Sequence, residues 1–162
     1  PVKSTAGRFV FWSTLMAGGF EAQGEGPAIR SLTGLPIRFR IGLTAASDMV
    51  GKLLVRTAQA GMQKSGGGRH YAGMPRQSSA PGAYPAVQSG QLLGSIDYQY
   101  HGMRLEFGSH GAFRKGFDYA IAQNEGTSKM APRPYLELTR AQTAAQVEHV
   151  LGTVTWQKII GG

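Results

Sequence analysis

Residues 119–136 read Y-A-I-A-Q-N-E-G-T-S-K-M-A-P-R-P-Y-L. A Glu-Gly-Thr turn at 125–127 leads to a Pro-Arg-Pro step at 132–134. Each proline fixes its own φ and moves the preceding residue toward extended geometry, so the backbone is stiff on both sides of Arg133. The guanidinium of Arg133 carries a rigid fork of donors that suits a carboxylate or a group of backbone carbonyls. The stretch predicts a rigid corner between a sheet and a helix; the alternative is an ordinary loop before a helix.

A β-hairpin is predicted upstream of this corner, over about 95–107. Its evidence is two runs of alternating apolar residues, one at 96, 98 and 100 and the other at 103, 105 and 107. The pair His101-Gly102 lies between the runs and is expected to be a two-residue connection. Downstream of the corner, apolar residues at helical spacing predict a C-terminal helix over about 135–152, with Gly152 near its end.

The segment before the hairpin is expected to hold a strand, a helix and a long loop. Apolar residues alternate with arginines over 37–41, which is typical of a half-buried strand. Ser47 is a candidate N-cap for an amphipathic helix over about 47–61, which Gly61 would end. Residues 64–88 are rich in Gly, Pro and Ser and predict a loop long enough to be functional. Residues 8–12 are a possible further strand.

The predicted fold is therefore α+β. A small antiparallel sheet is packed by the helices at about 47–61 and 135–152, with long loops and an N-terminal arm. We expect residues 1–35 to form the arm and residues 36–162 to form a single domain, because 162 residues are enough for one core.

The chain is basic but its charges are dispersed. The formal net charge is +8, and no run of five or six like charges occurs. This pattern favours a protein that works near DNA or on an acidic protein surface over a dedicated DNA-binding protein. No apolar stretch reaches 18 residues, so neither a transmembrane helix nor a membrane partner is expected.

The sequence does not contain a pattern typical of catalysis. Cysteine is absent, and the four histidines lack ligand-type spacing, so neither a metal site nor a cofactor is expected. The glycines at 66–68 follow a Lys-Ser pair, which reverses the order of a phosphate-binding loop. Glu106 and Glu125 are acid–base candidates only by elimination. The expectation is that the chain is not an enzyme and has no catalytic residue.

Two segments resemble a known family. Residues 78–96 match the pattern S-S-A-P-G-x-x-P-A-x-x-[ST]-G-x-L-x-x-S-I, and residues 119–136 match Y-A-x-x-x-E-[FY]-G-T-S-K-M-A-x-R-P-F-L. Together they resemble the neck and tail-completion proteins of long-tailed bacteriophages. The second block departs from its pattern in three ways: Gly126 directly follows Glu125 without the usual aromatic between them, Asn124 precedes that Glu, and Tyr135 replaces a phenylalanine.

The resemblance implies a structural virion protein, assembled in the bacterial cytoplasm, that joins the portal or connector to the tail tube. Its partners would be copies of itself in a sixfold ring, neighbouring connector or stopper proteins, and tail terminator or tail-tube proteins. Genomic DNA would pass through the ring without sequence-specific contacts. Two alternatives stay open: a tail-tube terminator and, from a different class, a basic DNA-binding protein.

The site hypothesis is a set of contacts with neighbouring subunits. Arg133 and, more weakly, Lys129 would anchor the corner to an acidic or carbonyl-rich surface. The full set of expected interface residues is Arg133, Lys129, Glu125, Thr127, Pro132, Pro134, Tyr135, Arg76 and Tyr84. The candidates for facing the DNA passage are Arg38, Arg40, Arg114 and Lys115, for which a merely solvated face is the alternative.

Overall fold

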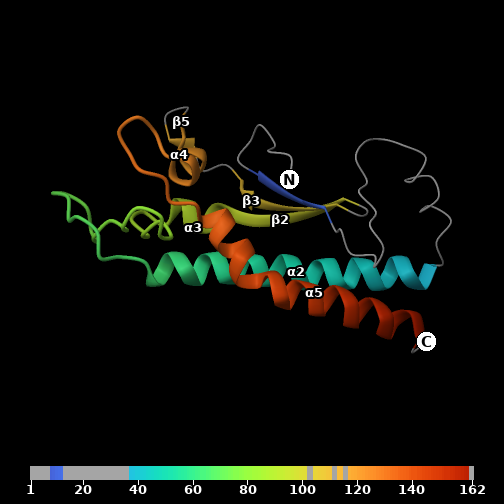
Figure 1. Cartoon of the computed structure of the whole chain (residues 1–162). Helices are drawn as coiled ribbons and strands as arrows, with labels where there is room; N and C mark the ends of the chain where they lie inside the picture. The colour runs from blue at the N-terminus through green and yellow to red at the C-terminus, as the bar shows by residue number, and fades with distance from the viewer. Residues whose placement is uncertain (1–7, 13–36, 102–103, 111–112, 115–116, 161–162) are drawn as a thin grey trace.

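The computed structural model describes residues 8–12, 37–101, 104–110, 113–114 and 117–160, and their fold is α+β (Figure 1). A three-stranded antiparallel sheet lies against long helices, and a strand pair and two short helices complete the described part. The elements in chain order are β1 Arg8–Trp12, α2 Ile37–Lys64, α3 Gln91–Ser95, β2 Ile96–His101, β3 Arg104–Ser109, β4 Phe113–Arg114, β5 Phe117–Asp118, α4 Tyr119–Glu125 and α5 Tyr135–Ile160.

The predicted hairpin is confirmed and forms two strands of the sheet. β2 and β3 pair antiparallel, with Tyr98 opposite Phe107 and Tyr100 opposite Leu105, as the alternation of apolar residues requires. His101 is paired with Arg104, so the expectation that His101 belongs to the connection is wrong. The other expected connection residue, Gly102, lies outside the described residues.

The sheet has a third strand from the N-terminal region. The possible strand at 8–12 is confirmed as β1, which pairs antiparallel with β3 and gives the strand order β1-β3-β2. This part of the predicted arm therefore extends the sheet of the domain. β3 is the central strand. Its neighbour β2 belongs to the same hairpin, and its other neighbour β1 comes from a distant part of the sequence.

The expected strand at 37–41 is wrong, because those residues form the first turns of α2. Five alternating residues are too few to decide between a strand and a helix, and Pro36 directly before them is a residue typical of a helix start. The Thr44 hydroxyl donates to the Arg40 carbonyl one turn earlier at 2.9 Å, as in a continuous helix. Ser47 is buried inside α2 and is not its N-cap, and the helix continues past Gly61 to Lys64.

The core lies between α2, α5 and the sheet. α2 contributes a buried stripe at intervals of four residues, which agrees with the predicted amphipathic face. Figure 1 shows α5 lying along α2, with the end of α5 toward the start of α2. α5 continues to Ile160, so Gly152 does not end it. The largest fully buried side chains are Tyr135, Phe107, Leu54, Met62, Val50, Thr139 and Thr143.

Two of these buried residues are threonines of α5. The hydroxyl of Thr139 donates to the Tyr135 carbonyl at 2.7 Å, and that of Thr143 donates to the Thr139 carbonyl at 2.8 Å. A buried hydroxyl without a partner would cost free energy, so these bonds within the helix allow polar residues to face the core.

Candidate functional site

The two segments that carry the resemblance meet in one corner of the structure. Arg133 donates from Nε to the Ser79 Oγ at 2.6 Å and from Nη2 to the Ser79 carbonyl at 3.1 Å. Its Nη1 donates to the Ala131 carbonyl at 3.3 Å. Two of the acceptors are backbone carbonyls, which are one of the two predicted kinds of acceptor, and the third is a hydroxyl; all three belong to the same chain. A role for Arg133 against a partner stays a prediction.

Backbone hydrogen bonds fix the path of the chain through this corner. The Gly82 N–H donates to the Pro132 carbonyl at 3.0 Å, and the Arg133 N–H donates to the Gln123 carbonyl at 2.7 Å. These bonds join the segment at 79–84 to residues 123 and 131–133, and the loop segment lies about 50 residues before the Pro-Arg-Pro step in the sequence. Such bonds hold the Pro-Arg-Pro step in one geometry, as the two prolines predict.

Gly126 forms the turn that ends α4. It ends α4 with a φ of 80°, and its N–H donates to the Ala122 carbonyl at 3.0 Å. A Cβ at this position would lie 2.8 Å from the Met130 carbonyl oxygen and 2.9 Å from the Pro132 nitrogen. Only glycine combines this left-handed backbone with such close neighbours, so the turn is built around it.

Two side chains that sequence reasoning did not select hold the helix starts beside the corner. The Asp118 Oδ1 accepts from the N–H groups of Ala120 at 2.9 Å and Ile121 at 3.2 Å, which caps α4. The buried Asn124 accepts at Oδ1 from the Leu136 N–H at 3.3 Å in the first turn of α5. Asp118 follows the usual cap pattern and could have been found, whereas Asn124 acts across a turn and gave no local signal.

Tyr84 attaches the long loop to both long helices. Its side chain is 8% exposed and its ring packs against Gly61 of α2. Its hydroxyl donates to the Gln142 Oε1 at 3.0 Å and shares a hydrogen bond with the Thr139 Oγ1 at 3.2 Å. Burial raises the pKa of the Tyr84 hydroxyl, so it stays protonated. The Ser65 hydroxyl donates to the Tyr84 carbonyl, which closes the base of the loop.

Two of the expected interface residues are core residues. Tyr84 is buried as described, and Tyr135 is 0% exposed at the start of α5. Burial, helped by the charges of Asp118 and Glu137, raises the pKa of the Tyr135 hydroxyl. The prediction that these two side chains contact another subunit is wrong, because the chain itself covers them.

The other expected interface residues of the corner lie nearer the surface. Glu125, Thr127, Lys129 and Pro132 are exposed, while Pro134 is half-buried. The Thr127 hydroxyl accepts from the Lys129 N–H at 3.2 Å, and Thr127 and Met130 exchange backbone hydrogen bonds at 2.8 and 3.2 Å. These contacts form a compact exposed turn, and its role in assembly stays a prediction.

Arg76 lies in a separate exposed feature, which we call the lobe and define as residues 69–77. All nine of its residues are exposed. The predicted loop at 64–88 is confirmed, and Figure 1 shows this loop reaching beyond the end of α2, away from the body of the molecule. The loop therefore has a buried base at Tyr84 and a protruding lobe.

The four candidates for the DNA passage are not brought together by the described part of the structure. Arg40 is exposed in the first turns of α2. The backbone of Arg38 lies in the same helix and that of Arg114 in β4, while Lys115 lies outside the described residues. β4 pairs with β5, and Figure 1 shows β5 at the opposite end of the molecule from the start of α2.

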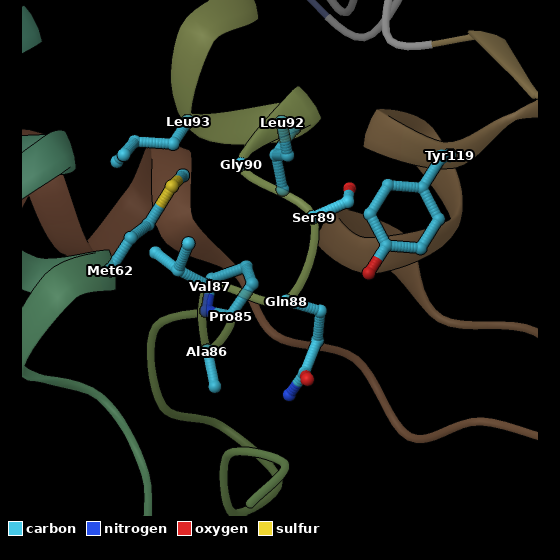
Figure 2. A pocket seen from close by; sticks show the side chains of 10 residues that line it. All are labelled: Met62, Pro85, Ala86, Val87, Gln88, Ser89, Gly90, Leu92, Leu93 and Tyr119. Carbon is cyan, nitrogen blue, oxygen red and sulfur yellow. The ribbon is translucent and has the colours of Figure 1, made fainter. Parts of the chain in front are cut away.

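A small pocket lies where the long loop meets α3 and α4 (Figure 2). Its volume of about 20 Å³ has room for about one water molecule. Small-molecule sites usually measure about 300–1,000 Å³, so the pocket is not built for a metabolite or cofactor. It is lined by Met62, Pro85, Ala86, Val87, Gln88, Ser89, Gly90, Leu92, Leu93 and Tyr119.

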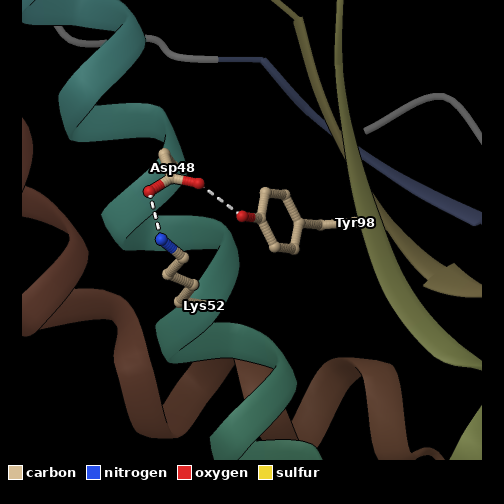
Figure 3. Close-up of polar contacts among 3 residues, drawn as sticks. All are labelled: Asp48, Lys52 and Tyr98. Carbon is tan, nitrogen blue, oxygen red and sulfur yellow. Dashed lines mark hydrogen bonds and ion pairs between the residues drawn. The ribbon is translucent and has the colours of Figure 1, made fainter.

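A polar cluster joins α2 to β2 (Figure 3). The Tyr98 hydroxyl donates to the Asp48 Oδ1 at 2.5 Å, and the Lys52 Nζ lies 2.6 Å from the Asp48 Oδ2. Lys52 and then Tyr98 stabilise the charged carboxylate, which holds the pKa of Asp48 below its usual value. The hydrogen bond to Asp48, together with some burial, raises the pKa of Tyr98 to about 12. The cluster links two elements of the fold.

Metal binding and membrane insertion have no support in the described residues. Within those ranges no group of three or more His, Cys, Asp or Glu side chains is placed to hold a metal ion. Among the helices that the structure describes, none is both long and apolar enough to cross a membrane.

Comparison with known proteins gives no relative for this chain. No model of a known family matches it, and searches of curated proteins and of solved structures find no match either.

Proposed function

We propose that this chain is a structural subunit of the connector between the head and tail of a long-tailed bacteriophage. Copies would form a neck or tail-completion ring around the path of the DNA, assembled in the host cytoplasm and retained in the virion. The observation that carries the proposal is that the two segments resembling the family's blocks bond to each other through Arg133 and Ser79. Such mutual support is expected if both blocks specify one shared structural unit.

Two exposed features near this corner of the molecule provide surfaces for assembly. The turn at 127–130 and the lobe project from a base that Arg133 and Tyr84 hold in place. In a ring, each subunit uses two different surfaces, one for each neighbour, and many weak contacts add up through high effective concentration. The partners would be copies of the chain, most simply in a sixfold ring, together with neighbouring connector and tail proteins.

A deletion experiment tests the proposal. The coding sequence is removed from the phage that carries it, and lysates are examined by electron microscopy. We expect complete heads and separate tails, and we expect the wild-type chain supplied from a plasmid to restore joined particles. Normally joined particles from the deletion would contradict the proposal. Tails of irregular length would indicate the tail-terminator alternative, because a terminator ends growth of the tube.

The exposed turn can be tested in the same complementation assay. Lys129→Glu reverses one exposed charge in the turn, and we expect it to lower the yield of joined particles. Arg56→Glu makes the same change of charge on the exposed face of α2 and is the matched control. Equal yields from both variants would remove Lys129 from the contact surface.

Arg133→Ala tests the brace of the corner. The variant loses the bonds to Ser79 and Ala131. We expect a folded chain, judged by circular dichroism, that gives fewer joined particles because the loop is no longer held in position. A normal particle yield would show that the brace is not needed for assembly.

A further inference from the structure

The lobe at 69–77 is exposed, held by hydrogen bonds and positively charged, and these properties suit contact with a polyanion. We propose that it binds the phosphates of double-stranded DNA without reading the base sequence. This inference deepens the proposed function and rests on it, because the proposed ring surrounds the path of the DNA. It assigns the DNA-facing role to Arg69 and Arg76.

The neck of the lobe is closed by hydrogen bonds. The Gly68 N–H donates to the Ser78 carbonyl at 2.7 Å. The Ser78 N–H and hydroxyl both donate to the Arg69 carbonyl, at 3.0 and 2.8 Å. At the tip, the Met74 N–H donates to the Tyr71 carbonyl at 3.1 Å across a turn in which Gly73 has a φ of 79°. Glycine at this position is what such a turn requires.

A second brace comes from the side chain of Gln88. Its Nε2 donates to the carbonyls of Arg76 at 3.1 Å and Gln77 at 3.2 Å, and its Oε1 accepts from the Arg76 N–H at 3.4 Å. Directly after the lobe, Arg133 holds Ser79. A protruding segment that is already ordered loses less conformational entropy when it binds a partner.

The charged side chains of the lobe are both positive. They are Arg69 and Arg76, and the sequence has no Asp or Glu from residue 49 to residue 96. The Arg69 guanidinium lies 5.5 Å from the centre of the Tyr71 ring, which orients it by a cation–π contact. Lys64, exposed at the end of α2, adds a further positive charge before the lobe.

A second copy of the chain is a poor partner for these charges. Exposed carboxylates in the described part lie on separate elements: Asp48 on α2, where Lys52 already pairs with it, Asp97 on β2, Glu125 at the end of α4 and Glu148 on α5. Duplex DNA instead presents closely and regularly spaced phosphates. Arginine and tyrosine side chains are common phosphate contacts, and the lobe exposes both types.

The test measures how salt weakens binding of the full chain to a short fluorescent DNA duplex, followed by anisotropy. Each phosphate contact contributes about 0.9 to the slope of log affinity against log salt concentration. We expect Arg69→Gln/Arg76→Gln to weaken binding at low salt and to reduce the slope by about 2. Arg56→Gln/Arg140→Gln removes the same charge from exposed positions on α2 and α5, outside the lobe, and is expected to keep the slope. Circular dichroism checks that both variants fold.

Three results would overturn the inference: no binding of the duplex by the wild-type chain at low salt, equal weakening by the two double variants, or lobe-dependent binding to polyglutamate but not to the duplex. The last result would indicate an acidic protein as the partner. The proposed function is judged separately, by whether the deletion phage makes joined particles. If DNA binding depends on the lobe but the deletion phage still makes joined particles, the inference about the lobe stands and the connector role is rejected.

Discussion

Two tyrosines pack on the same helix in the same way, but their surroundings differ. Tyr98 from β2 lies against Gly51 of α2, and Tyr84 from the long loop lies against Gly61. At both glycines an added Cβ would overlap the tyrosine ring. The two glycines lie ten residues apart on α2, and because they lack a side chain they leave room for tyrosine rings from two different parts of the chain.

The difference lies in what each hydroxyl reaches. Tyr98 is half-buried and bonds to Asp48 on the same helix, where Lys52 also neutralises the carboxylate. Tyr84 is buried and bonds to Thr139 and Gln142 on α5, so it joins the loop to two helices. The sheet that carries Tyr98 has further buried core contacts through Leu105 and Phe107. The loop has polar attachments through Ser79 and Gly82, but Tyr84 is the largest side chain that it buries in the core. The comparison indicates that Tyr84 is the main attachment of the loop, whereas Tyr98 is one attachment among several.

The largest effect is expected from Tyr84→Ala. Removing a buried aromatic side chain typically costs about 3–5 kcal/mol of unfolding free energy, and here it also frees the base of the loop. Urea unfolding followed by circular dichroism measures the loss. Tyr98→Ala is the matched variant, and its loss should be clearly smaller because the ring is half-buried. Equal losses would contradict the difference between the two attachments.

The stability of Gly61→Ala and of Gly51→Ala compares the two glycine positions. Each substitution gains up to about 1 kcal/mol of helix propensity but displaces a ring. The overlap at Gly51 is the tighter one, at 2.2 Å against 2.6 Å at Gly61, but Tyr98 is half-buried and has solvent to turn toward, so we expect Gly51→Ala to cost less than Gly61→Ala. Tyr84 is enclosed, so overpacking should make Gly61→Ala less stable by about 1–3 kcal/mol. The reverse order in thermal or urea unfolding would show that Tyr84 moves more freely than Tyr98.

A smaller effect is expected from Tyr84→Phe, which keeps the ring but loses the bonds to Thr139 and Gln142. Thr139 still donates to the Tyr135 carbonyl and Gln142 is exposed to water, so neither partner is left buried and unpaired. The loss of unfolding free energy should be about 1 kcal/mol. A loss as large as that of Tyr84→Ala would mean that the hydroxyl, and not the ring, holds the loop.

The smallest effect concerns Tyr98 and pH. Its pKa is raised from 10.0 to about 12 in the folded chain, so its contribution is complete below about pH 10 and disappears as the pH rises through about 12. The stability difference between the wild type and Tyr98→Phe should therefore shrink over this interval. Unfolding at a series of alkaline pH values measures it, and a difference that does not change with pH would exclude the bond to Asp48 as its source.

The local patterns predicted elements better than contacts. The alternation through Tyr98 and Tyr100 identified the hairpin because the side-chain period of a strand is a local property. The same kind of alternation at 37–41 was misleading, since a helix with apolar residues on more than one side produces it over a single turn.

The candidate site was only partly accessible to sequence reasoning. The chemistry of the Arg133 fork predicted its carbonyl acceptors, but Ser79 lies 54 residues away and nothing in the local pattern names it. For the same reason Tyr84 and Tyr135 were expected at an interface, because a motif does not state which of its residues the chain itself buries. Gly61 was expected to end a helix, whereas it accommodates a ring from a distant loop.

The proposed role of the chain is that of a fixed component of a virus particle. Its most direct test is mass spectrometry of purified particles from the phage that encodes it, combined with averaged electron microscope images of particles carrying a tagged chain. We predict that the chain is present and that the tag forms a ring at the junction of head and tail. Complete, joined particles that lack the chain would contradict the claim.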